Sequence, residues 1–290
     1  MYPIKYTNPS QLLHALTPLY MLLETHQTGH QHLIFSSVTR MQFEEDLISP
    51  EVHASFSGFL KYCYHHPTQS LAVKVPLPLH FTVVASIFKK MIDRQLFKMD
   101  LLDTEGWNNT LRNIVYIGDW ALEPDFYWVL STKTRYTSPS VVLEVGTAED
   151  FPQLADKASI WLETLESNVQ AFITIQLDYN NECDLASDTA IRITVWRLTP
   201  TNKAYQSVCV GIVRLRSLLG RLSTSVLWYS TDPVTETVTS DKGIRLELEL
   251  FARKKASRNP FSASDVFLSR RLPAGFAEEF WRINQCGNVG

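Results

Sequence analysis

The pattern of apolar and polar positions is most informative between residues 121 and 165. The runs 121–130 and 139–145 are apolar and rich in β-branched and aromatic residues, and the polar segment STKTRYTS separates them. This pattern predicts two strands joined as a hairpin. A loop centred near residues 134–135 sets a register in which Asp125 lies opposite Glu144.

Two carboxylates that face each other in a hairpin would form an unusual pair. Directly opposed side chains in antiparallel strands have Cβ atoms about 4.5–5.5 Å apart. At that distance two carboxylates repel unless one is protonated or a cation lies between them. One interpretation is therefore a cation site at Asp125 and Glu144. The alternative is a register shifted by one residue, which would place them on opposite faces as ordinary strand-end charges.

The pattern then changes to helical spacing over residues 151–165. Asp150 is a suitable N-cap, Gln153 follows three residues later, and Pro152 lies in the first turn, where a missing N–H costs little. One apolar stripe follows, formed by Phe151, Leu154, Ala158, Trp161, Leu162 and Leu165. Lys157 lies at the border of this stripe and could bring its ammonium toward the two carboxylates. A solvated Lys157 is the alternative.

The remaining pattern places helices in the first part of the chain and strands in the rest. We expect helices over residues 10–25, 37–48 and 81–97, and strands over 114–117, 169–177, 191–198 and within 205–252. This order predicts an α/β fold with a mixed sheet flanked by helices. We expect one compact unit over residues 1–290. It would contain a mainly helical region at 1–105, a core at 106–200, and a β-rich extension with closing helices at 201–290.

Composition and charge limit the classes of partner that this chain is expected to bind. The 290 residues are 45% hydrophobic and 20% charged, enough for a core in an ordered globular protein. A formal net charge of −3 gives no general attraction to nucleic acid or anionic membranes, so such binding would need a local basic patch. The clearest local patch contains Lys254, Lys255 and Arg258, which makes nucleic acid a candidate partner. Oligomeric state stays open.

Cysteine spacing and the N-terminal sequence favour an intracellular protein. The four cysteines are widely separated and form no CxxC pair, a pattern typical of reduced thiols. The N-terminus lacks the features of a signal peptide, and no apolar run approaches the ~18 residues of a membrane span. We therefore expect a location in the nucleus or cytoplasm and no membrane partner.

The segments LEPD and PSVVLEVG, followed by the helix that contains Lys157, resemble the PD-(D/E)XK superfamily, the restriction-endonuclease-like fold. In particular, the chain is similar to uncharacterised fungal proteins related to the Uma group of predicted nucleases. Pro124 and Asp125 stand at the PD positions, and Glu144, Val145 and Gly146 stand at the (D/E)XK positions. The resemblance covers about residues 110–200, is weak over the tail, and is absent over the first 100 residues.

This resemblance implies a Mg²⁺-dependent or Mn²⁺-dependent nuclease, and we expect its substrate to be DNA rather than RNA. In the family the two acids and the backbone carbonyl after the second acid bind the metal, which gives these roles to Asp125, Glu144 and Val145. Gly146 replaces the usual lysine, and Lys157 would supply the missing positive charge. The alternative is a catalytically inactive relative that serves as a nucleic-acid or protein binding or scaffolding module.

Overall fold

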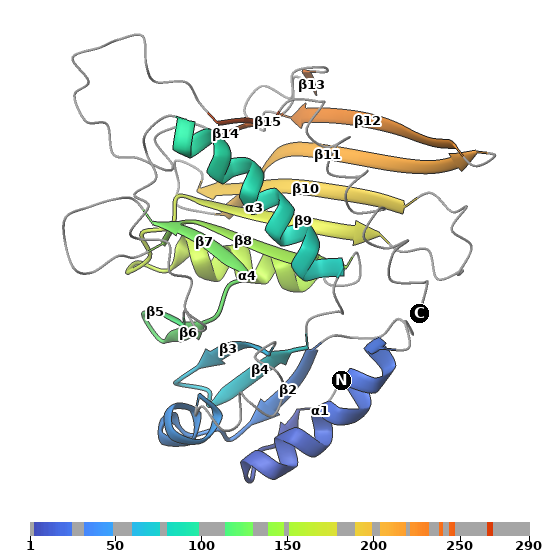
Figure 1. The fold of residues 1–290 in the computed structure, drawn as a ribbon. Coiled ribbons are helices and arrows are strands. Elements are labelled where there is room, and N and C mark those ends of the chain that lie inside the picture. Colours follow the sequence, from blue (N-terminus) through green and yellow to red (C-terminus); the bar gives the residue numbers. More distant parts are fainter. Residues whose placement is uncertain are drawn as a thin grey trace. The chain divides into compact units, whose positions relative to one another are not determined.

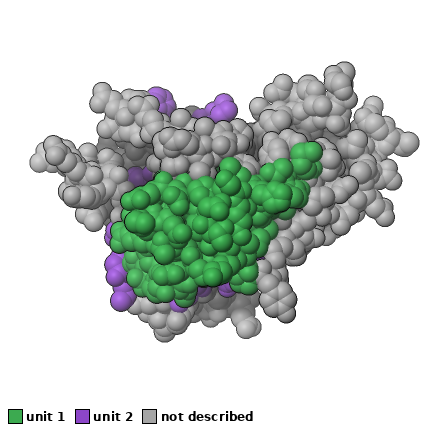
Figure 2. Space-filling view, turned by 90° about the horizontal axis from the view of Figure 1, so that it is seen from below, with its two compact units in different colours: residues 1–82, 109–124 green, residues 83–108, 125–290 purple. Residues whose placement is uncertain are grey.

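The structure is a computed structural model, and it describes thirteen segments of the chain. They are residues 3–24, 32–48, 60–75, 80–98, 114–129, 139–147, 151–178, 189–198, 204–218, 221–231, 238–239, 244–246 and 266–268. The chain divides into two compact units, coloured separately in Figure 2, where the sequence predicted one. Unit 1 contains residues 1–82 and 109–124, and unit 2 contains residues 83–108 and 125–290.

Unit 1 is built on a six-stranded sheet with the order β1-β2-β4-β3-β6-β5. Its strands are β1 (Ile4–Lys5), β2 (His32–Ser36), β3 (Lys61–His65), β4 (Ser70–Lys74), β5 (Val115–Ile117) and β6 (Trp120–Leu122). Only β1 and β2 run parallel within this sheet. The region 1–105, predicted to be mainly helical, thus supplies four of these strands.

Two helical segments accompany the sheet of unit 1. Helix α1 (Pro9–Glu24) begins where predicted, because Asn8 Oδ1 accepts a hydrogen bond from the Gln11 N–H and Pro9 fits the first helical position. The predicted second helix appears as η1 (Gln42–Leu47), which has π-helical geometry. Their buried apolar residues pack with those of the strands into one core, which includes Leu12, Leu16, Phe35, Phe43, Leu47, Tyr62 and Tyr64.

Unit 2 is built on a seven-stranded sheet with the order β13-β12-β11-β10-β9-β8-β7. These strands are β7 (Phe126–Val129), β8 (Pro139–Thr147), β9 (Ala171–Asp178), β10 (Thr189–Leu198), β11 (Ala204–Leu218), β12 (Arg221–Thr231) and β13 (Val238–Thr239). Strands β8 and β9 are parallel and the other pairs are antiparallel, so the sheet is mixed, as predicted. Strands β11 to β13 lie within residues 201–290, where the sequence predicted a β-rich extension.

One element of the C-terminal part differs from the prediction. Strands β14 (Ile244–Leu246) and β15 (Val266–Leu268) pair in a separate two-stranded sheet. We expected the segment FSASDVFLSRRL to form a closing helix, and this was wrong for residues 266–268. The run VFL is apolar and β-branched at its start, which suits a short strand.

Two helices flank the sheet of unit 2 on opposite faces (Figure 1). Helix α4 (Phe151–Glu163) connects the parallel strands β8 and β9 as a crossover. Helix α3 (His80–Lys98) contacts β7 through the side chains of Asp93 and Trp128. The architecture is therefore mixed α/β, with a mixed sheet flanked by helices. None of the described helices is both long and apolar enough to cross a membrane.

The buried face of α4 follows the predicted stripe. Its buried residues are Leu154, Ala158, Trp161 and Leu162. Leu165 is instead 97% exposed, because the helix ends at Glu163 and the chain turns before Leu165. The N-cap predicted at Asp150 lies outside the described residues.

Candidate active site

The register between β7 and β8 determines where the two acids lie. The predicted strand 121–130 is in fact two strands, β6 in the sheet of unit 1 and β7 in the sheet of unit 2. In β7, Phe126 pairs with Leu143 and Trp128 pairs with Val141. Continued by one residue, this register brings Asp125 opposite Glu144, as predicted, and the alternative shift by one residue is absent here.

Asp125 lies in the bend that precedes β7 and is half-buried. Its Oδ2 accepts a hydrogen bond of 2.8 Å from the backbone N–H of Val145. The N–H and C=O of a strand residue point to the same neighbouring strand. The carbonyl of Val145 is therefore directed to the same edge of β8 as the Asp125 carboxylate.

Glu144 and Lys157 form an ion pair between β8 and α4. Lys157 Nζ lies 3.1 Å from Glu144 Oε1. The Glu144 side chain is 1% exposed and that of Lys157 is 13% exposed. Burying a carboxylate is unfavourable unless a counter-charge accompanies it. The ammonium of Lys157 supplies that charge, so Lys157 turns toward Glu144 and the solvated alternative does not hold.

The sheet face under α4 becomes polar toward the ends of β8 and β9. One row across the strands contains Glu144, Thr174 and Thr194, all buried. The next row contains Gly146, Gln176 and Arg192. Gln176 was not among our predicted site residues. The available signal was the alternation of polar Thr174 and Gln176 with apolar neighbours in AFITIQLD, which indicates one polar face of β9.

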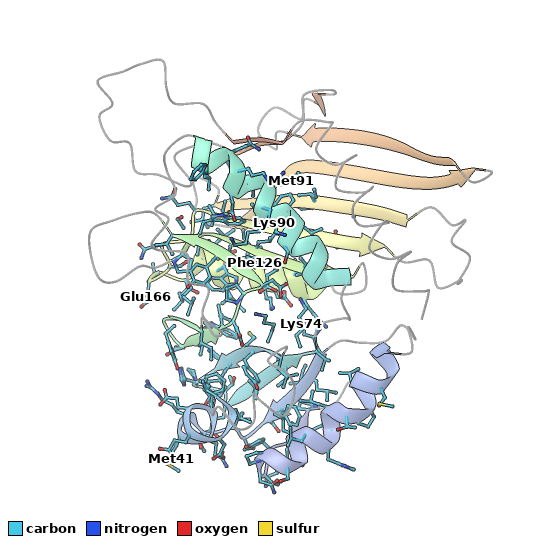
Figure 3. The ribbon with its side chains drawn as sticks, in the orientation of Figure 1. Met41, Lys74, Lys90, Met91, Phe126 and Glu166 are labelled. Atoms are coloured by element: carbon cyan, nitrogen blue, oxygen red, sulfur yellow. The ribbon has the colours of Figure 1, made fainter. Side chains whose placement is uncertain are left out.

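The opposite face of β7 carries a second, partly buried ion pair. Lys89 Nζ lies 2.6 Å from Asp93 Oδ2, and Trp128 Nε1 donates a 3.0 Å hydrogen bond to Asp93 Oδ1. The Lys89 ammonium also lies 5.9 Å from the ring centre of Phe126, which is labelled in Figure 3. Lys89 is only 9% exposed, whereas its neighbour Lys90 lies on the exposed face of α3.

Burial controls the protonation of the acid in this second pair. It raises the pKa of the Asp93 carboxyl above its ordinary 3.8, and the hydrogen bonds from Lys89 and Trp128 only partly offset the effect. These contacts attach α3 to the edge strand β7. They lie on the other face of the sheet from Glu144, so we assign them a structural role.

The residues at the first pair fit the chemistry of Mg²⁺ or Mn²⁺. Asp125, Glu144 and the Val145 carbonyl offer only oxygen donors, which hard cations prefer. Within the described segments no group of three or more His, Cys, Asp or Glu side chains could hold a metal. Two carboxylates nevertheless suffice for Mg²⁺, which usually keeps several waters and shares its site with substrate phosphates.

The sequence-predicted basic patch at Lys254, Lys255 and Arg258 lies outside the described residues.

No family model matches this chain, and no curated protein or solved structure matches it either. Its chemistry must therefore be inferred from the geometry that brings Asp125, Glu144 and Lys157 together.

Proposed function

We propose that this chain is a Mg²⁺-dependent nuclease with a restriction-endonuclease-like core, hydrolysing phosphodiester bonds in DNA rather than RNA. The observation that carries the proposal is the position of Lys157 Nζ, 3.1 Å from Glu144 Oε1. An acid pair and a cation from the next helix are the groups that the PD-(D/E)XK resemblance requires. Gly146 leaves the usual lysine position empty, and Lys157 brings an ammonium to the same acid.

Each residue has a distinct part in the proposed reaction. Asp125, Glu144 and the Val145 carbonyl would hold the metal. When bound, Mg²⁺ polarises the phosphoryl oxygens and lowers the pKa of a water that can attack phosphorus. In the proposed hydrolysis, a water oxygen would bond to phosphorus and release one proton to solvent as one ester P–O bond breaks, and the departing oxygen would take a proton from solvent. The Lys157 ammonium stabilises the extra negative charge on the phosphoryl group.

The buried ion pair also supports a second candidate function. Lys157 already neutralises Glu144, so the pair could serve stability alone in a catalytically inactive relative. Such a chain would act as a nucleic-acid or protein binding or scaffolding module. The missing lysine at Gly146 favours this alternative, whereas the carboxylate of Asp125 beside Val145 favours the nuclease.

Nicking of supercoiled plasmid separates the two functions. We expect Mg²⁺-dependent nicking by the wild type and its loss in Glu144→Ala. Asp156→Ala is the matched control, because Asp156 is exposed on α4 and is directed away from the sheet. Nicking that persists unchanged in Glu144→Ala would come from a contaminant, and the inactive module would then be the better assignment.

A further inference from the structure

Gln176 on β9 carries a buried acceptor that the ion pair at Glu144 does not explain. Its side chain is 4% exposed. Its Oε1 is buried and has no hydrogen-bond partner among the residues that the structure describes. Buried polar atoms in proteins are nearly always paired with protein or water, so this oxygen calls for a partner.

The position of Gln176 places it beside the proposed site. It pairs with Gly146 on β8, and Glu144 pairs with Thr174 two residues earlier on β9. Side chains two residues apart on a strand share a face, and neighbouring strands lie about 4.8 Å apart. Gln176 is therefore on the same face as Glu144, next to a residue that has no side chain.

A second amide oxygen approaches from α4. Gln153 precedes Lys157 by four residues, so the two lie on one face of the helix. Because α4 returns antiparallel to β8 before β9 begins, Gln153 is one turn nearer than Lys157 to the row of Gly146 and Gln176. The Oε1 of Gln153 is also buried and lacks a hydrogen-bond partner within the described segments.

The chemistry of these two oxygens restricts what they can bind. An amide oxygen accepts hydrogen bonds, so its partner must be an O–H or N–H donor. Phosphate diester oxygens are acceptors and do not meet this need. Water does, and a water can donate to an amide oxygen while its own lone pair faces another group.

We propose that Gln176 is a further catalytic residue, whose Oε1 accepts a hydrogen bond from the water that attacks phosphorus. This role rests on the proposed nuclease function. The water oxygen forms its bond to phosphorus as the ester P–O bond breaks, one water proton passes to solvent, and the leaving oxygen takes a proton from solvent. The Gln176 amide exchanges no proton and orients the lone pair of the water.

Gln176→Met tests this role because it keeps the volume and removes the acceptor. With supercoiled plasmid and Mg²⁺, we expect kcat to fall about 10²-fold while KM changes little. Gln176→Glu keeps an acceptor and should restore part of kcat. If the Gln176 amide had only a structural role, the Gln176→Glu substitution would not restore kcat specifically.

Thr194→Val is the matched control for Gln176→Met. Thr194 is also buried, and its Oγ1 has no hydrogen-bond partner in the described part of the chain, but it lies on β10, two strands away from β8. We expect its kcat to equal that of the wild type. A folded Gln176→Met variant with wild-type kcat would overturn the role of Gln176 alone. If Gln176→Met misfolds, a Gln176→Glu variant whose kcat is no higher than that of Gln176→Met would overturn it as well. The absence of any cleavage that depends on Glu144 would overturn the nuclease function and this role together.

Discussion

The ion pair of Glu144 and Lys157 matters both for the stability of this protein and for its proposed chemistry. Both side chains are largely withdrawn from water, at 1% and 13% exposure. In a low-dielectric environment neither charge is tolerated alone, whereas the pair is roughly neutral in its effect on stability. A metal that binds Glu144 would compete with Lys157 for this carboxylate.

Removing Lys157 alone should therefore destabilise unit 2. We expect Lys157→Met to lower the free energy of unfolding by about 3 kcal/mol, because Glu144 would be left buried without its counter-charge. The double variant Glu144→Gln/Lys157→Met should recover much of this loss. Urea denaturation of the four proteins in a double-mutant cycle measures the coupling.

Lys90→Met provides the control for that cycle. Lys90 is exposed on α3, so its replacement should change the free energy of unfolding by less than about 0.5 kcal/mol. A Lys157→Met variant as stable as Lys90→Met would mean that the pair contributes nothing, and that Glu144 is satisfied in another way.

Part of this site could be predicted from the sequence, and physical reasons explain which residues were predictable. Asp125 and Glu144 were predictable because hairpin register fixes which residues face each other. Lys157 was predictable as a border residue of an amphipathic helix, but its direction was not. Gln176 was missed because a single polar residue in a strand shows only which face it occupies, and its relation to Gly146 depends on the parallel pairing of β8 and β9.

Among the elements, the clearest difference from prediction is the break between β6 and β7. The run 121–130 is apolar at both ends, which favoured one strand. At its centre Glu123 and Pro124 interact with Lys61 of β3, through a 3.6 Å ion pair and a 3.2 Å hydrogen bond. Proline cannot donate a ladder hydrogen bond, and it marks the point where the chain leaves one sheet for the other.

The position of β4 shows that prolines after a strand do not restrict it to a sheet edge. Proline is typical of edge strands, and Pro76 and Pro78 follow β4, yet β4 lies between β2 and β3. The strand ends at Lys74, before either proline. Proline restricts only the residues whose N–H it removes and its direct neighbour, so it says little about a strand that has already ended.

The attachment of α3 to β7 through Asp93 should depend on pH. The folded-state pKa of Asp93 is raised, so the folded state binds a proton more tightly than the unfolded state. This contribution to the free energy of unfolding is fully present below pH 3.8, the ordinary pKa of the carboxyl. It is lost as the pH rises through the raised folded-state pKa. Asp93→Asn keeps the acceptor for Trp128 and removes the titration.

Denaturation of wild type and Asp93→Asn between about pH 3 and pH 7 measures this effect. We expect the wild type to lose stability relative to the variant as pH rises through that window. Stability curves that stay parallel over the whole range would show that Asp93 has the same pKa in the folded and unfolded states.

At the scale of the whole molecule, the net charge implies that the proposed DNA contacts come from a local basic patch. The formal net charge of −3 opposes general binding to a polyanion. The local cluster of Lys254, Lys255 and Arg258 is the strongest basic feature of the sequence. Phosphate contacts release counterions, so their number appears in the salt dependence of binding.

Neutralising this patch should weaken DNA binding and its salt dependence together. In Lys254→Gln/Lys255→Gln/Arg258→Gln, the slope of log K against log salt should become shallower by up to about 3. Fluorescence anisotropy with a labelled duplex measures it. Lys90→Gln/Arg94→Gln, which neutralises two exposed charges on α3, is the control. An unchanged slope in the triple variant would exclude the patch from the interface.

The division of the chain into two units was not predictable from its pattern. Both units draw on segments from distant parts of the sequence, since residues 109–124 complete unit 1 and residues 83–108 belong to unit 2. No long linker marks the change in the sequence. Local periodicity indicates elements, but the sheet that each element joins depends on pairing between distant strands.

A thermal-shift titration with Mg²⁺ or Mn²⁺ tests the central claim most directly. We expect the metal to raise the melting temperature of the wild type, with a stabilisation of about 2.7 kcal/mol at a concentration one hundred times Kd. The rise should vanish in Asp125→Ala and persist in Asp156→Ala. No rise in the wild type, or an equal rise in Asp125→Ala, would contradict a metal site at Asp125 and Glu144.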